Sequence, residues 1–568
     1  MPRSQKGSLD AWEIDQKPLR EAPSLFAIMK PNLLGFIRRL QWGAAITLVA
    51  WHLSVVDFAH ASEAPEARLP LLMPDDFEWL HIASWRVELG VPDPHNPLLE
   101  PAMPWDAGGI MAHGTVLHDP IDGLWKAWQV STPAEERFEG LAAQHEHQRR
   151  LTYLESKDGI KWYRPMMSLV RWPGYDRTNI LLDLDSGGTS VYASVLVNPA
   201  HTAWPYEMFV MRGPLYGGQK ENKVGHLPGP AERLGTYRYR SKDGKDWKLI
   251  EGPIHASVGG GADVSYVYRK PDGSYYSYFK TYNPLREGDR IIRYDNNPRG
   301  GLRSVAMRSS PNGTDWGDDV LVLARDWRDP DFAQFLELCP VEVKGGYVAL
   351  VNYYDAVNQT MSLQLAASRD GIRWWRPDRR PALPNPSLGD YGGGMIWQMH
   401  HPIVEGNTMY VYYAGSEGIH GEIHDSRLQP QVEVGNELVS GIQKPTLPFN
   451  TALCRASWQF DRLWALVSSA GGATLGEAVT RPGKLAGAKL AVNVLVKSGG
   501  ALRAELLDAV GEPIPGFTSD DCTPLTGDHH RITFEWRGGT VAPAGAVKTR
   551  FVLKRAFLYG FAWEKQTP

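Results

Sequence analysis

A phrase of seven residues, Ser-x-Asp/Asn-Gly-x-x-Trp, occurs four times in this chain of 568 residues and constrains its fold more than any other feature. The copies stand at residues 156–162, 241–247, 310–316 and 368–374. Asp-Gly and Asn-Gly favour a tight turn, because these residues tolerate positive φ and the Asx side chain can bond nearby backbone amides. The Trp can fill an apolar gap between neighbouring units. A turn and an anchor that recur in this way predict a repeat array.

Runs of short alternating strands surround each copy, and a fifth unit ends at residues 460–462 without the phrase. Short antiparallel strands in five units of similar size fit radial repetition better than a sandwich, because a closed ring protects strand edges. The sequence therefore predicts an all-β protein with a five-bladed β-propeller over residues 96–468.

The pattern changes after residue 472. Apolar residues alternate over residues 490–496, Ser498-Gly499-Gly500 follows, and a second apolar run covers residues 502–506. This arrangement predicts a β-hairpin, and later strand-like runs predict a C-terminal β-sandwich over residues 473–568. Residues 62–95 are interpreted as a proline-rich approach segment to the propeller.

The first 61 residues indicate a leader with a secretory signal peptide. Arg38-Arg39 precede an apolar run at residues 42–56, and Ala59-His60-Ala61 offers small residues for cleavage. A membrane anchor is the alternative, but the run is shorter than the roughly 20 apolar residues that a membrane span needs. No stable span is therefore expected after cleavage. We expect a secreted or periplasmic protein. Three cysteines supply at most one disulfide.

Charge and motifs exclude several classes of function. A formal net charge of -4 without a basic block argues against a nucleic-acid partner. No Gly-rich phosphate loop precedes a helix and no Gly-x-Ser-x-Gly elbow occurs, and the sequence predicts no cofactor. His145-Glu146-His147 lacks the i, i+4 spacing of a zinc pair and has no evident third ligand, so no metal site is predicted. The many Trp and Tyr residues suit both core packing and stacking on sugar rings, and most of them are expected in the core.

Glycoside hydrolysis needs two carboxyl groups, one to protonate the leaving oxygen and one to attack the sugar or activate water. A propeller can bring such groups together from the first strands of different blades. Acids at or within those strands are the catalytic candidates; for each, a solvated loop acid or a turn cap is the alternative. They are Asp106, Asp263, Asp331 and Glu337. Candidate substrate-binding residues nearby are Trp105, His113, Lys280, Arg328, Asp329, Asp390, Trp397, His400 and His420.

The repeats and domain order resemble the furanosidase-type glycoside hydrolases, which include the invertase and levanase group and the arabinanase and xylosidase group. Arg328-Asp329-Pro330 resembles the invertase Arg-Asp-Pro triplet, and Glu337-Leu338-Cys339-Pro340 resembles Glu-Cys-Pro with one residue inserted. The resemblance implies that Asp329 stabilises the transition state and that Glu337 is the general acid. Both motifs fall in one expected blade, and the invertase nucleophile motif has only Trp105-Asp106 as a counterpart, so a divergent branch is indicated.

The leading hypothesis is an exported glycoside hydrolase that uses paired carboxylates at the propeller axis. A non-catalytic carbohydrate-binding propeller is one alternative, because the second unit offers no acid at its first strand. A glycoside phosphorylase is another, for which Arg328 and Lys280 are the available cations.

Overall fold

The computed structural model describes an all-β chain. The described residues are 68–132, 149–182, 189–213, 235–256, 264–283, 286–287, 290–291, 302–420, 431–434, 437–440, 451–470 and 474–565. The predicted leader and signal peptide lie outside them. The described residues include no helix with the length and apolarity that a membrane crossing requires.

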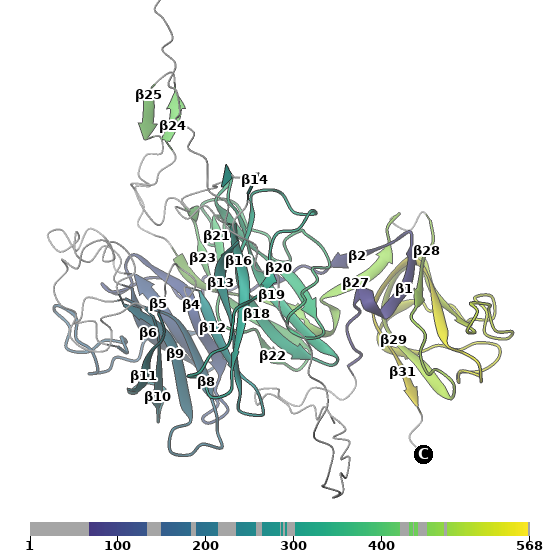
Figure 1. The fold of residues 1–568 in the computed structure, drawn as a ribbon, viewed down its shortest axis with the longest axis horizontal. Coiled ribbons are helices and arrows are strands. Elements are labelled where there is room, and N and C mark those ends of the chain that lie inside the picture. The colour runs from purple at the N-terminus through teal and green to yellow at the C-terminus, as the bar shows by residue number, and fades with distance from the viewer. Residues whose placement is uncertain are drawn as a thin grey trace, which may run out of the picture. The chain divides into compact units, whose positions relative to one another are not determined.

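Three antiparallel sheets of four strands follow one another along the chain (Figure 1). The first contains β4 (Gly109–His118), β5 (Trp125–Thr132), β6 (Arg150–Ser156) and β7 (Trp162–Tyr163). The second contains β8 (Thr189–Val197), β9 (Tyr206–Gly213), β10 (Gly235–Ser241) and β11 (Trp247–Ala256). The third contains β12 (Ser265–Arg269), β13 (Tyr275–Asn283), β16 (Leu302–Ser310) and β17 (Val320–Leu323).

An eight-stranded sheet covers the expected fourth and fifth units. Its first part contains β18 (Ala333–Val343), β19 (Gly346–Asp355) and β20 (Thr360–Ser368). Its second part contains β21 (Met395–Gln398), β22 (Ile403–Glu405), β23 (Thr408–Ser416), β26 (Thr451–Gln459) and β3 (Val91–Pro92). One parallel pair, Met361 with Met395, joins the two parts.

Two short two-stranded sheets are separate from the larger ones. They are β14 (Arg286–Glu287) with β15 (Arg290–Ile291), and β24 (Gln431–Val434) with β25 (Glu437–Ser440).

The repeated phrase forms the same turn at all four positions. At residues 156–162 the Ser156 hydroxyl accepts a hydrogen bond from the Gly159 amide at 3.0 Å. The Asp158 carboxylate accepts from the amides of Ile160 and Lys161 at 2.9 and 2.8 Å. Glycine is needed because φ at Gly159 is 70°, and the equivalent glycines have φ between 73° and 83°. The predicted turn is confirmed.

Each turn contacts the sheet that precedes its own. The Trp128 indole donates to the Gly244 carbonyl, Arg238 donates to the Asn312 carbonyl, and the Tyr278 hydroxyl donates to the Gly371 carbonyl. The first turn contacts the last sheet, since the Tyr412 hydroxyl of β23 donates to the Gly159 carbonyl at 2.7 Å. The first strands of these sheets also contact one another in this order: β4 contacts β8, β8 contacts β12, and β21 contacts β4. The contacts therefore form a closed cycle.

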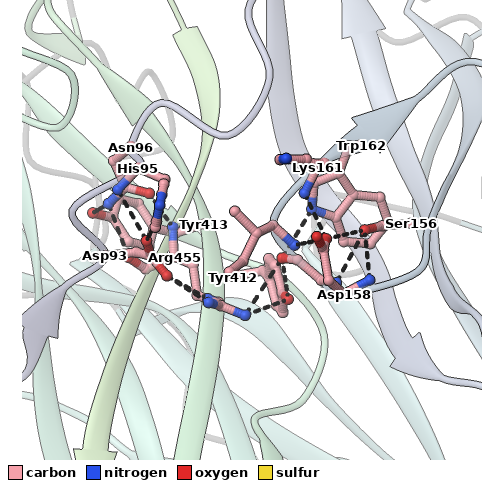
Figure 2. A network of polar contacts seen from close by, with 12 residues as sticks. Asp93, His95, Asn96, Ser156, Asp158, Lys161, Trp162, Tyr412, Tyr413 and Arg455 are labelled. Atoms are coloured by element: carbon pink, nitrogen blue, oxygen red, sulfur yellow. Dashed lines mark hydrogen bonds and ion pairs between the residues drawn. The ribbon is translucent and has the colours of Figure 1, made fainter.

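Arg455 of β26 is the centre of the polar network that closes this cycle (Figure 2). Its guanidinium binds Asp93, which follows β3, with Nη2 2.5 Å from Oδ2. It also donates to the Tyr412 hydroxyl at 3.2 Å and to the Gly159 carbonyl at 3.4 Å. Asn96 adds two bonds to the Arg455 backbone. One buried cation thus links the N-terminal strand, the last sheet and the first repeated turn.

A seven-stranded sheet covers the C-terminal part of the chain. Its path runs through β1 (Phe77–His81), β28 (Gly476–Thr480), β31 (Lys548–Lys565), β27 (Trp464–Ser468) and β2 (Ala83–Val87). β29 (Ala488–Leu507) pairs with β31 and with β30 (Gly527–Thr533). The predicted approach segment therefore supplies two strands to this sheet, and β27 lies within residues assigned from sequence to the propeller.

The predicted hairpin at Ser498-Gly499-Gly500 is wrong. Both apolar runs pair with β31 in one direction, so that Leu490 lies opposite Trp563 and Leu502 lies opposite Leu553. The register shifts between Val496 and Ala501, which makes the glycine pair a bulge in one long strand. A bulge and a tight turn both select glycine, and the alternation on either side is the same for both.

Candidate functional site

Irregular backbone occurs at the same level in three first strands. Pairing of β4 with β5 shifts between Met111 and Thr115, and pairing of β8 with β9 shifts between Val191 and Ser194. Pairing of β18 with β19 shifts between Phe335 and Leu338. These shifts contain three side chains that contact or surround one another, namely His113, Tyr192 and Glu337. Bulges of this kind redirect side chains and are common next to active sites.

Two of these side chains stand on left-handed backbone. His113 has φ of 59° and Tyr192 has φ of 58°, and Val264, just before β12, has φ of 51°. Residues with a Cβ adopt this region rarely, at a cost of order 1–3 kcal/mol. The fold therefore stabilises strained backbone where three sheets approach the same group of side chains.

His113 and Glu337 form a buried pair at the centre of the group. His113 Nδ1 lies 2.8 Å from Glu337 Oε1, and the two residues are 4% and 2% exposed. The other carboxyl oxygen, Oε2, is buried and has no hydrogen-bond partner among the described residues. A buried carboxyl oxygen without a partner is costly, so its presence at a set of bulges points to a functional role.

Burial and nearby cations favour neutral forms of both groups. Burial raises the pKa of Glu337 well above its usual value, although Lys280 of β13 acts against this shift. Burial lowers the pKa of His113 well below its usual value, and the charges of Arg149, Lys280 and His420 lower it further. A protonated carboxyl beside a neutral imidazole is the arrangement that an acid catalyst needs near neutral pH.

Aromatic rings surround the pair. The His113 ring centroid lies 4.9 Å from that of Tyr192, with the planes at 70°, and 5.2 Å from that of Trp397 in β21. Tyr192, Trp397 and Val264 belong to one buried apolar cluster. Three of the predicted site residues therefore meet in this group, namely His113, Glu337 and Trp397. Two more, Lys280 and His420, act on His113 through their charges.

His400, another predicted site residue, is buried against Thr115 and Tyr266. Its Nδ1 lies 3.1 Å from the Thr115 hydroxyl, and its ring stacks on Tyr266 of β12 with centroids 5.0 Å apart. Burial raises the pKa of Tyr266 well above its usual value, and the charge of Glu337 acts in the same direction.

Two other buried acids, Asp106 and Asp329, are each paired with an arginine. Asp106 accepts hydrogen bonds from the amides of Ala102 and Met103, and Arg164 donates to its Oδ2 at 2.9 Å. Asp329 binds Arg376 and accepts from the Asp326 amide at 3.0 Å. These bonds account for the burial of both carboxylates without a ligand. Next to Asp106, Trp105 packs in a separate apolar cluster and donates to Asn179 at 2.7 Å.

Three further predicted residues are exposed. Asp331 forms an ion pair with Arg325 at 2.6 Å. Arg328 and Asp390 are exposed, whereas the His113–Glu337 pair is buried. Asp263 lies outside the described residues, one position before Val264. The structure thus brings together the inward residues of first strands and leaves the loop acids apart.

Sequence reasoning missed Tyr192, Tyr266 and Arg149. Tyr192 lies at the register shift of β8, which the strand pattern of the sequence does not mark. Arg149 stands just before β6, and no motif marks it. The described residues contain no group of three or more His, Cys, Asp and Glu placed to hold a metal ion.

No protein-family model and no curated protein matches the chain. Solved structures that match the chain include a β-1,2-mannobiose phosphorylase from Listeria innocua, at 14% identity and a TM-score of 0.41; the match covers 66% of this chain and 98% of that one. An N-acetylgalactosamine deacetylase from F. plautii matches at 15% and 0.41, over 67% and 97% of the two chains. A thermostable family-43 glycoside hydrolase matches at 14% and 0.37, over 54% and 84%. TM-scores below 0.5 do not establish a shared fold or activity.

Proposed function

We propose that this protein is a carbohydrate-active enzyme that cleaves a glycosidic bond, with Glu337 as its general acid. The observation that carries the proposal is the His113–Glu337 pair, in which one carboxyl oxygen is bonded and the other is buried without a partner. The resemblance of residues 337–340 to the Glu-Cys-Pro motif supports the same role.

In this proposal Glu337 donates its proton to the leaving oxygen of the sugar. The O–H bond of Glu337 breaks as the proton transfers, and the carboxylate that forms is stabilised by Lys280, whose charge already acts on Glu337. His113 holds the Oε1 side of the carboxyl, so Oε2 is the oxygen that can face a ligand. Trp397 and Tyr192 supply aromatic surface beside the pair.

We assign the second carboxyl to Asp263. This residue precedes Val264, whose carbonyl accepts a hydrogen bond from the Lys280 amide at 3.2 Å and whose side chain packs with Tyr192 and Trp397. Asp106 and Asp329 are not assigned, because arginines already occupy their oxygens. A second carboxyl from a neighbouring sheet meets the requirement for two groups with different roles.

The proposal includes a five-bladed propeller as the scaffold. Its support is the cycle of turn contacts, together with β3, which adds an N-terminal strand beside β26. The last part of the large sheet, β21-β23-β26-β3, then has four strands like the first three blades, whereas the fourth blade has the three strands β18, β19 and β20. The fourth and fifth blades are linked by the single Met361–Met395 strand pair, which supports a division of the sheet at this point. A C-terminal sandwich and export through the leader remain parts of the proposal.

Phosphorolysis is a second candidate, because two buried cations accompany the pair. Arg149 and Lys280 both act on His113, and both are less than a tenth exposed. In a phosphorylase such cations bind the phosphate that attacks the sugar. The sequence offered Arg328 for this role, but Arg328 is exposed and Arg149 fits the requirement better.

Turnover of a panel of 4-nitrophenyl furanosides and pyranosides by the full chain, with and without inorganic phosphate, tests the proposal. We expect Glu337→Gln and Asp263→Asn each to lower kcat/KM by about 10²–10⁴-fold, while Glu342→Gln, on an exposed position of the same strand as Glu337, leaves it unchanged. Dependence on phosphate would select phosphorolysis. Retained turnover in Glu337→Gln, or binding without turnover of any glycoside, would reject the catalytic role.

A further inference from the structure

Trp327 is the most exposed tryptophan in the part of the chain that the structure describes. Its exposed fraction is 89%, and among the other described tryptophans only Trp79, at 46%, is also exposed. Tryptophan is highly buried on average in folded proteins, so an indole that stands in water is available to stack on a ligand.

The turn that carries Trp327 has a fixed backbone. The Asp329 amide donates to the Asp326 carbonyl at 3.0 Å, and the Asp326 amide donates back to the buried Asp329 carboxylate at 3.0 Å. Arg376 binds the same carboxylate, and Arg379 donates to the Asp326 carboxylate at 2.6 Å. A ring presented on a fixed backbone loses less conformational entropy when it binds a ligand.

This turn lies at the end of the sheets where the first strands begin. The last strand of the third sheet, β17, ends at Leu323, which pairs with Val305 near the start of β16, and the loop that follows leads into β18. Glu337 is the fifth residue of β18 and five residues after Phe332. At the rise of an extended strand, Phe332 lies at most about 17 Å from the proposed acid.

Charged side chains flank the exposed indole. Asp326 and Arg328 are exposed on either side of Trp327, and the exposed Asp331 forms an ion pair with Arg325 at 2.6 Å. Sugar sites combine an aromatic ring with a few hydrogen-bonding groups, whereas the centres of protein interfaces are depleted in charged residues. The composition of this surface therefore favours a carbohydrate ligand over a protein partner.

We propose that Trp327 is the stacking surface of a second carbohydrate subsite, which binds a sugar unit of the substrate remote from the bond that is cleaved. This inference rests on the proposed function and extends it, because the substrate must then be an oligosaccharide or polysaccharide that reaches from Glu337 to the turn. Trp327 adds affinity for the chain and takes no part in bond cleavage.

Affinity electrophoresis of the full chain tests the subsite without an activity measurement. The gels contain soluble arabinan, levan, xylan or mannan as probes. We expect at least one of them to retard the wild-type protein, Trp327→Ala to lose most of the retardation, and Trp327→Phe to keep part of it. Trp79→Ala is the matched control, since Trp79 is exposed on β1 of the C-terminal sheet, and it should migrate like the wild-type protein.

Three results of this experiment would overturn the subsite. They are equal retardation of Trp327→Ala and the wild-type protein, no retardation in any gel, and self-association of the wild-type protein that Trp327→Ala abolishes while migration in the polysaccharide gels stays unchanged. The last result would assign the indole to a contact between copies of this chain.

Kinetics distinguish a failure of this inference from a failure of the proposed function. For Trp327→Ala we expect a loss of about 10-fold in kcat/KM on the retarding polysaccharide, carried by KM, with turnover of 4-nitrophenyl monoglycosides unchanged. An equal loss on both substrates would overturn the remote subsite. Retardation that depends on Trp327, without turnover of any glycoside, would reject the enzyme and keep the binding site.

Discussion

The repeated turns and the group around His113 and Glu337 both place polar residues on irregular backbone, but they differ in whether those residues have hydrogen-bond partners. In the turn at residues 156–162, Ser156 and Asp158 bond the backbone amides of the turn itself. In the group around His113, Glu337 is less exposed than Asp158, yet one of its carboxyl oxygens has no hydrogen-bond partner in the part of the chain that the structure describes.

This difference separates structural acids from a candidate catalytic acid. The turn carboxylates gain stability from their bonds, which hold their pKa values below the usual Asp value. The carboxyl of Glu337 is buried at a cost, and its pKa is raised. Removal of charge should therefore have opposite effects on stability in the two regions.

The largest expected effect is on activity. Glu337→Gln keeps the size of the side chain and removes the acid, so we expect a loss of about 10²–10⁴-fold in kcat/KM on a glycoside that the wild-type protein cleaves. The midpoint of thermal unfolding should rise near and above neutral pH. A raised folded-state pKa contributes stability only at low pH and loses it as the pH rises, and Gln does not ionise. A lower midpoint together with full activity would contradict the comparison.

Arg455→Ala should give the largest loss of stability in the turn region. Arg455 and Asp93 are both largely buried, and removal of one partner from a buried pair costs about 3–5 kcal/mol. Urea unfolding measures the change. Arg373→Ala is the control, because Arg373 also pairs with an aspartate, Asp370, but its side chain is 89% exposed. Equal effects of the two substitutions would show that Arg455 does not close the cycle of sheets.

A smaller effect is expected from the turn acids at low pH. Backbone hydrogen bonds lower the pKa of Asp158; at Asp243 and Asp370 burial raises it, but hydrogen bonds from backbone amides and side chains outweigh burial. Lowered folded-state pKa values contribute stability at neutral pH that is lost as the pH falls below the usual Asp value of about 3.9.

The third turn suggests the variant for this test. Asn312 makes the same bonds to the amides of Thr314 and Asp315, both at 2.9 Å, and does not ionise. The triple variant Asp158→Asn, Asp243→Asn, Asp370→Asn should keep the fold and lose part of the acid dependence of unfolding. An unchanged pH dependence, followed by thermal unfolding between about pH 2 and 7, would show that these carboxylates are not the groups responsible.

The turns could be predicted from sequence because their chemistry is local. Ser, Asp and Gly in one phrase supply the acceptor, the second acceptor and the positive φ, and all partners lie within seven residues. Contacts between the ends of the chain leave no such pattern. Nothing in Val91–Pro92 indicates pairing with β26, and β1 and β2 showed no sign that they join β28 and β27.

The site could be predicted only in part for the same reason. His113, Glu337 and Trp397 were found because they stand on expected first strands. Asp106 and Asp329 looked equivalent in sequence, and what distinguishes them is the arginine that each one binds, 58 and 47 residues away in the chain. Bulges moved Tyr192 into the group, and a register shift of this kind is not visible in a strand pattern.

The ionisation of Glu337 is the most direct test of the account. Infrared difference spectra of the wild-type protein against Glu337→Gln, recorded across pH, follow the band of the protonated carboxyl. We expect this band to be present at pH 7 and to disappear only well above the usual Glu pKa of about 4.3. A Glu337 carboxyl that ionises near pH 4 would contradict the account.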